Sequence, residues 1–140
     1  HFDGGGFTIF NLTCDKKASA SNYASLFGVL YGSCKNLNID NATITSSNAC
    51  GVIGGYVGTS GKPGLVENVT ITNSLVTNTG TPAGGVCGVA REGSFKNVSF
   101  QGEIVSTNDK STSSNDVFTA VSANAGGFAG LTTGTASAQM

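Results

Sequence analysis

The sequence predicts an all-β fold, a right-handed parallel β-helix (β-solenoid) of about four coils with three short strands each. Apolar residues alternate with polar ones in short runs, which is typical of strands with one buried face. These runs recur at intervals near 30 residues, and no segment has apolar residues at helical spacing over ten or more residues. Composition agrees, because the 140 residues include 21 glycines and only 11% charged residues.

The first recurring element is a strand built around an asparagine. Aligned on that residue, its four copies give one column: Asn11, Asn36, Asn68 and Asn97. Apolar residues stand two positions before, one after and three after each asparagine, with polar residues between them. Asparagine tolerates left-handed turns, and stacked side-chain amides can hydrogen-bond to one another. The column is therefore predicted to form a structural ladder.

The second recurring element is a short apolar segment that ends in glycine. The four copies supply the predicted turn glycines: Gly28, Gly51, Gly54, Gly85, Gly88, Gly127 and Gly130. We expect them to turn corners with positive φ and to let neighbouring backbones approach closely. A third short strand is expected between the two elements, at 42–45, 75–77 and 104–106.

These repeats divide a single domain, residues 1–140, into units at about 4–31, 32–63, 64–92 and 93–134. One unit cannot bury its apolar face alone, whereas stacked units can. A twisted β-sandwich is the weaker alternative, because it would not explain columns that stay in register.

The pattern resembles GLUG-motif repeats, which occur in bacterial surface proteins and beside IgA-specific metallopeptidases. Residues 2–12 look like the stretch with which such β-helices often begin, and Gly51–Gly54 and Gly127–Gly130 look like the signature of the repeat. The first unit departs from it, with Ser25 in place of the first glycine. The resemblance covers nearly the whole chain and implies a β-helix that serves as a stalk or module.

The segment 106–124 is longer than its counterparts. The interval from Gly88 to Gly130 is 42 residues, against 26 and 34 for the earlier intervals. Extra residues in a solenoid form a loop on one face, often the contacting face. We expect either a flexible polar loop or a contact loop; for the latter the candidate residues are Asp109, Asp116 and Phe118.

No catalytic, metal or cofactor site is predicted. Parallel β-helices that cleave polysaccharides need clustered carboxylates, but the eight acids here fall in different columns. The single histidine is His1, which makes a Ser–His arrangement improbable. We therefore expect the chain not to be an enzyme.

The four cysteines match no zinc pattern. Cys14, Cys34 and Cys87 replace apolar residues in the columns and are expected to be small buried side chains, while Cys50 replaces a glycine or alanine. A Cys34–Cys50 bridge across one coil would be feasible if a corner lay between them. Disulfide pairing stays open.

Asn-x-Ser/Thr triplets begin at four asparagines, three of them in the predicted ladder. The fourth, Asn41, is the predicted acceptor if a glycan is attached, because a glycan would not fit inside a ladder.

A net charge of -1 without a basic cluster excludes a nucleic-acid partner, and no apolar stretch approaches the ~20 residues of a membrane span. The chain begins at His1 without a signal peptide, which suggests a processed form or an excised segment. We predict a non-enzymatic structural module, extracellular or on the cell surface: a stalk or a head-to-tail stacking subunit. Its partners would be other copies of itself or flanking coils of a larger protein. The alternative is an adhesin-type module that binds a glycan or a host protein through the 106–124 loop.

Overall fold

The computed structural model describes residues 1–17, 23–80, 82–106, 129–133 and 137–139, which form strands and no helix. The strands are β1 (Phe2–Asp3), β2 (Thr8–Phe10), β3 (Thr13–Lys16), β4 (Phe27–Leu30), β5 (Gly32–Asp40), β6 (Thr43–Ser46), β7 (Gly54–Val57), β8 (Gly64–Asn78), β9 (Cys87–Arg91), β10 (Gly93–Ser106), β11 (Ala129–Thr133) and β12 (Ser137–Gln139). Within these ranges, nothing forms a helix long and apolar enough to cross a membrane.

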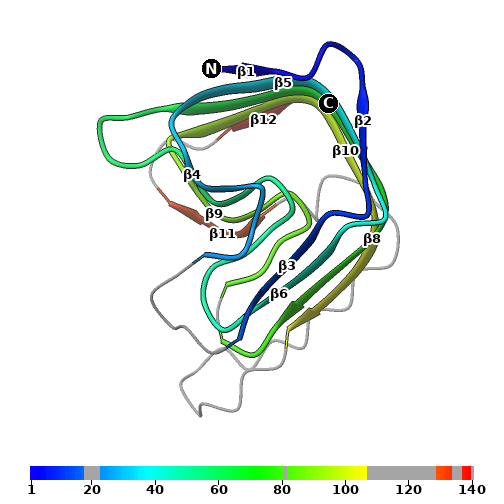
Figure 1. Cartoon of the computed structure of the whole chain (residues 1–140). Coiled ribbons are helices and arrows are strands. Elements are labelled where there is room, and N and C mark those ends of the chain that lie inside the picture. Colours follow the sequence, from blue (N-terminus) through cyan, green and yellow to red (C-terminus); the bar gives the residue numbers. More distant parts are fainter. Residues whose placement is uncertain (18–22, 81, 107–128, 134–136, 140) are drawn as a thin grey trace.

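The chain winds into stacked coils whose strands pair in parallel. Phe2 pairs with Cys34, Cys34 with Val66 and Val66 with Phe95, so the described chain returns to the same place in three successive turns. Phe95 then pairs with Ala138, after a connection that includes residues 107–128, outside the described ranges. Figure 1 looks along this stack. The prediction of an all-β parallel solenoid is confirmed, and this is the fold that the resemblance to GLUG-motif repeats implies.

The coils contribute to two sheets. The larger one runs β1-β5-β8-β10-β12, with β2, β3 and β6 paired beside this path, and the smaller one runs β11-β9-β7-β4. The prediction of three short strands in every coil is wrong in detail, because the first two join in later coils: β8 and β10 are continuous over 64–78 and 93–106. Single residues with positive φ, such as Asn68 and Asn73 in β8, bend these strands without ending the pairing.

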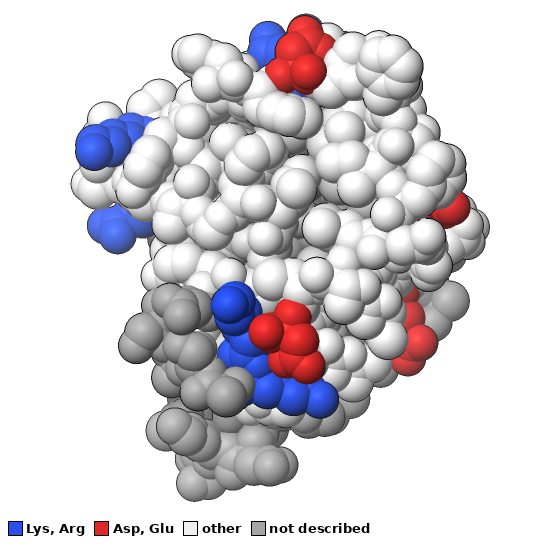
Figure 2. Space-filling view, in the orientation of Figure 1, with Lys and Arg blue, Asp and Glu red and all other residues white. Residues whose placement is uncertain are grey.

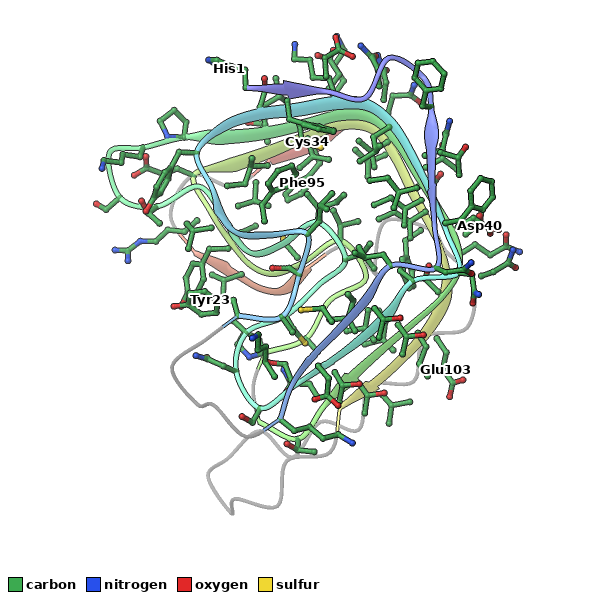
Figure 3. The ribbon with its side chains drawn as sticks, in the orientation of Figure 1. His1, Tyr23, Cys34, Asp40, Phe95 and Glu103 are labelled. Carbon is green, nitrogen blue, oxygen red and sulfur yellow. The ribbon has the colours of Figure 1, made fainter. Side chains whose placement is uncertain are left out.

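The core lies between the sheets and consists of short stacks of inward-facing side chains. Three such stacks have members that are 0% exposed: Cys34 on Val66, Ile39 on Ile71, and Ile44 on Val76. Figure 3 shows the side chains of Cys34 and Phe95 inside the coils, whereas Asp40 and Glu103 point outward. β-Branched and aromatic residues suit such a pleated, half-buried surface.

The register of the smaller sheet differs by one residue from the predicted column. If Gly28 and Gly54 were equivalent, as the repeat predicts, Phe27 would pair with Ile53. Phe27 pairs instead with Gly54, and Gly54 pairs with Cys87. The backbone N–H groups of Ile53 and Gly54 both donate to the carbonyl of Val86, at 2.9 and 3.2 Å. This shared acceptor accommodates the extra residue.

Five of the predicted turn glycines lack the positive φ that was expected of them. Of the five in fully described positions, Gly28, Gly51, Gly54, Gly85 and Gly88, none has positive φ. Gly51 and Gly88 instead allow close packing: a Cβ on Gly88 would lie 2.5 Å from the nitrogen of Cys50, and one on Gly51 would overlap Cys87. Gly130 lies in β11, and Gly127 lies outside the described residues.

Truncation of a stacked core residue tests the register of the larger sheet. Ile71→Ala removes a fully buried side chain between Ile39 and Phe100 and should lower the free energy of unfolding by about 2–5 kcal/mol in urea titrations. The neighbouring Thr70 is exposed, so Thr70→Ala should change it by no more than about 0.5 kcal/mol. Equal effects of the two substitutions would contradict this assignment of inner and outer faces.

Candidate functional site

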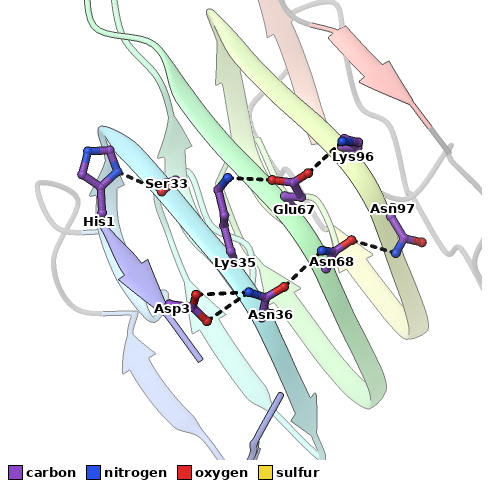
Figure 4. Close-up of polar contacts among 9 residues, drawn as sticks. All are labelled: His1, Asp3, Ser33, Lys35, Asn36, Glu67, Asn68, Lys96 and Asn97. Atoms are coloured by element: carbon purple, nitrogen blue, oxygen red, sulfur yellow. Dashed lines mark hydrogen bonds and ion pairs between the residues drawn. The ribbon is translucent and has the colours of Figure 1, made fainter. Parts of the chain in front are cut away.

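The most ordered polar surface lies along the first corner of the coils, formed by Asn36, Asn68 and Asn97, whose φ values are 53°, 52° and 50°. The Nδ2 of Asn97 donates to Oδ1 of Asn68 over 2.9 Å, and Nδ2 of Asn68 donates to Oδ1 of Asn36 over 3.0 Å (Figure 4). Nδ2 of Asn36 donates to both carboxylate oxygens of Asp3, each at 3.1 Å. The amides are therefore oriented in one direction, with their donors toward the first coil.

Asn11 does not belong to this column, contrary to the prediction. Phe10 pairs with Asp40, which places Asn11 beside Asn41 at a second corner, and Nδ2 of Asn41 donates to Oδ1 of Asn11 over 2.7 Å. The first coil turns the first corner with glycines: Gly5 and Gly6 have φ of 60° and 78°. These extra residues shift the alignment of everything that follows in the first coil.

The second corner consists of Asn11, Asn41 and Asn73, all with positive φ, and sequence reasoning missed it. Asp40 sits beside it and accepts hydrogen bonds from Oγ1 of Thr72 at 2.8 Å and Nδ2 of Asn73 at 2.7 Å. These two bonds lower the pKa of the Asp40 carboxyl. The signal that could have revealed the corner is the second asparagine five residues after Asn36 and Asn68.

Asn41, the candidate glycan acceptor, therefore lies in a corner too rather than in a separate turn. Its side-chain nitrogen already donates to Asn11, and its side chain is exposed. The arrangement does not single it out from the other triplets, and glycosylation there stays a prediction.

A column of alternating charges runs beside the first corner. Nζ of Lys35 lies 2.7 Å from one carboxylate oxygen of Glu67, and Nζ of Lys96 lies 2.9 Å from the other (Figure 4). Asp3 pairs with Lys35 on the other side, so the column reads acid, base, acid, base. Hydrogen bonds from Lys35 and then Lys96 lower the pKa of Glu67. The residue before each aligned asparagine carries this signal in the sequence.

All four cysteines are free thiols, so the Cys34–Cys50 bridge considered from the sequence is absent. Cys34, Cys50 and Cys87 are buried, and Cys14 is half-buried. Burial raises the pKa of Cys34 and of Cys50 to about 11 and raises that of Cys87 as well. Buried thiols with raised pKa values are poor nucleophiles, so these residues act as core side chains.

Two further polar contacts join residues of neighbouring coils. Nδ1 of His1 lies 2.9 Å from Oγ of Ser33, and both carboxylate oxygens of Glu92 accept the N–H of Gly61 at 3.1 Å. Within the described part of the chain, no three His, Cys, Asp or Glu side chains gather as a metal site would require. The face in Figure 2 is largely uncharged, with small separate groups of acids and bases. The candidate contact residues Asp109, Asp116 and Phe118 lie outside the described residues.

Comparison with known proteins gives one relative and one structural neighbour to report. No family model matches the chain. The relative is halomucin from Haloquadratum walsbyi, 41% identical over 88 residues that make up 61% of this chain and about 1% of halomucin. The neighbour is the crystal structure of a candidate immunoglobulin A1 protease from Bacteroides ovatus, with 17% identity and a TM-score of 0.44 over 99% of this chain and 68% of that one. A likeness at that score says nothing about what this chain does.

The left-handed backbone and the amide hydrogen bonds at the first corner contribute separately to stability, and two substitutions can distinguish their contributions. Asn68→Ala loses both ladder bonds and places a Cβ at positive φ, whereas Asn68→Gly loses the bonds but relieves the backbone. We expect the alanine variant to be less stable than the glycine variant by about 1 kcal/mol in urea unfolding. Equal stability of the two variants would show that the backbone conformation is not what selects asparagine.

The ion pairs at Glu67 predict a pH dependence of stability. Because the pKa of Glu67 is lowered in the folded chain, its contribution is present above the ordinary carboxyl pKa and is lost as pH falls through the lower folded value. Unfolding free energies of the native chain and of Glu67→Gln, measured from pH 7 down to pH 3, should therefore converge at the acid end. Glu103→Gln serves as a control, since no ion pair of Glu103 is found in the described chain. If the difference in unfolding free energy between the native chain and Glu67→Gln stayed constant from pH 7 to pH 3, the stabilising role of the ionised Glu67 would be contradicted.

Proposed function

We propose that the chain is a non-enzymatic structural module of an extracellular surface protein, in which stacked coils form a stiff spacer. The observation that carries this proposal is the use of its polar side chains. The amides of both corners and the Lys35–Glu67–Lys96 ion pairs join one coil to the next. A binding or catalytic site would present such polar side chains to a ligand, whereas here they bond to the neighbouring coil.

The satisfaction of the polar groups supports a structural role over catalysis. Among the described residues, no buried side-chain nitrogen or oxygen lacks a hydrogen-bond partner. Unsatisfied or strained polar groups often accompany active sites, because catalytic groups wait for a substrate. The pKa shifts of Asp3, Asp40 and Glu67 have local structural causes, and all three side chains lie on the outside of the coils.

The relative supports an extracellular setting, as part of a larger protein. The segment similar to this chain occupies about 1% of halomucin, so in that protein it is a small part of a very long polypeptide. A solenoid suits such a context, because each coil contacts only its neighbours and extends the stack by about 4.8 Å. Adhesion through the 106–124 loop remains the other prediction, and the described residues offer nothing in its favour.

Particle size and shape across a concentration series test the structural role. Sedimentation and negative-stain images should show either rigid single particles or filaments that grow with concentration, and in both cases no retention on a glycan array. Filaments would identify stacking of separate copies, whereas particles that stay monomeric would identify a spacer within one polypeptide. A monomer that binds a defined glycan with micromolar or better affinity would overturn the proposal in favour of a binding module.

A further inference from the structure

The core is open at the end formed by the first coil. Phe2 is 38% exposed, although Cys34 and Val66 below it in the same stack are 0% exposed. Ile9 and Cys14 are half-buried, whereas the residues on which they stack, Ile39 and Ile44, are again 0% exposed. The inward side chains of the first coil thus form an apolar cross-section with nothing above it.

The corresponding inward residues of the fourth coil are almost fully covered: Phe95 is 4% exposed, Phe100 3% and Ile104 1%. Among the core side chains whose burial the structure describes, exposure is therefore concentrated in the first coil. A complete solenoid hides the ends of its core, so this exposed cross-section calls for an occupant.

The free strand edges and the charges of the first coil indicate which kind of partner would fit there. β1 and β4 are the outermost strands of their sheets, so their free edges can accept another parallel strand. The charge column ends at this edge with the carboxylate of Asp3, after Glu67 and Lys35 in alternating order. The next position therefore calls for a basic residue, which would donate to the carboxylate of Asp3 as the amide of Asn36 does from the other side.

We infer that the exposed end of the first coil is a docking surface for a further parallel solenoid coil that presents lysine opposite Asp3. This inference rests on the proposed structural function and adds the identity of the neighbouring surface. Figure 2 looks onto this end, which is largely uncharged apart from its margins, as a surface that buries apolar area should be.

A second copy of this chain fits the surface less well. The fourth coil does carry Lys96 and Asn97, but β12 already pairs with β10 along the edge that holds Lys96. Two first coils facing each other would bring their Asp3 carboxylates onto one small surface, which disfavours the contact. The occupant is therefore a coil outside residues 1–140.

The chain itself supplies a probe of suitable chemistry. Because Phe2 pairs with Cys34 and Cys34 with Val66, a copy of residues 32–64 placed directly before His1 enters the stack in register. The copied Lys35 then stands opposite Asp3, and the copied Ile44 covers Cys14. The matched control is the same extension with Lys35→Glu in the copy only.

The extended full chain should show a higher Tm by about 5 °C or more and slower alkylation of Cys14, by about tenfold or more, than the original chain. The control extension with glutamate should show a smaller rise in Tm and a smaller slowing of Cys14 alkylation. An extension that stays sensitive to protease and leaves Cys14 reactive would overturn the docking surface. The proposed spacer role would still stand if the unextended chain remained a rigid, non-binding particle.

Two other results would also overturn the inference. Equal gains for the lysine and glutamate extensions would remove the charge preference and with it the stated chemistry of the partner. Dimers of the unextended chain that dissociate on Asp3→Lys, detected by sedimentation, would identify a second copy as the occupant.

Discussion

Parallel pairing of each coil with the next is the constraint on which the rest of the structure depends. Each residue of the larger sheet stands over its equivalent in the neighbouring coil, so its side chain must fit that one position. Ile39 meets Ile71, and Ile71 meets Phe100, which makes the core a set of stacks rather than one three-dimensional cluster. Stability then arises mainly between neighbouring coils, as in other solenoids.

The corners follow from the same constraint. At the first corner the strand bends through one residue in the left-handed region without losing its partner, and this bend recurs at Asn36, Asn68 and Asn97. Asparagine tolerates this conformation and adds an amide that bonds to the next corner, as Asn68 does with Asn36. The first coil uses Gly5 and Gly6 at this place, and there Asp3 supplies the acceptor that an asparagine would have offered.

The sequence was sufficient for the architecture because period-two alternation and repeat spacing are properties of the pattern alone. Register was predicted less well. Asn11 was assigned to the wrong corner because two additional residues at Gly5 and Gly6 leave no trace in the apolar pattern. Gly54 was misplaced because Ile53 and Gly54 share one carbonyl, a purely local backbone arrangement.

The ion pairs and the roles of the glycines were not predicted, for a related reason. Ion pairs between Glu67 and the two lysines involve residues about 30 positions apart, and they become visible only after the register is known. The roles of the glycines depend in the same way on neighbours from other coils: Gly88 is required by the proximity of Cys50, not by its own φ. Sequence patterns describe one coil at a time, whereas these features belong to pairs of coils.

The alternating column also bears on how the coils keep their order. Exposed ion pairs contribute little to stability, so Lys35, Glu67 and Lys96 are a weak source of cohesion. Their alternating order matters more for excluding stacks in which the coils pair in the wrong sequence. If the third coil were skipped, Lys35 would face Lys96, and two like charges would meet at adjacent positions. The repeats are similar enough in their apolar columns to be exchanged, and the charges distinguish coils that the core alone would accept.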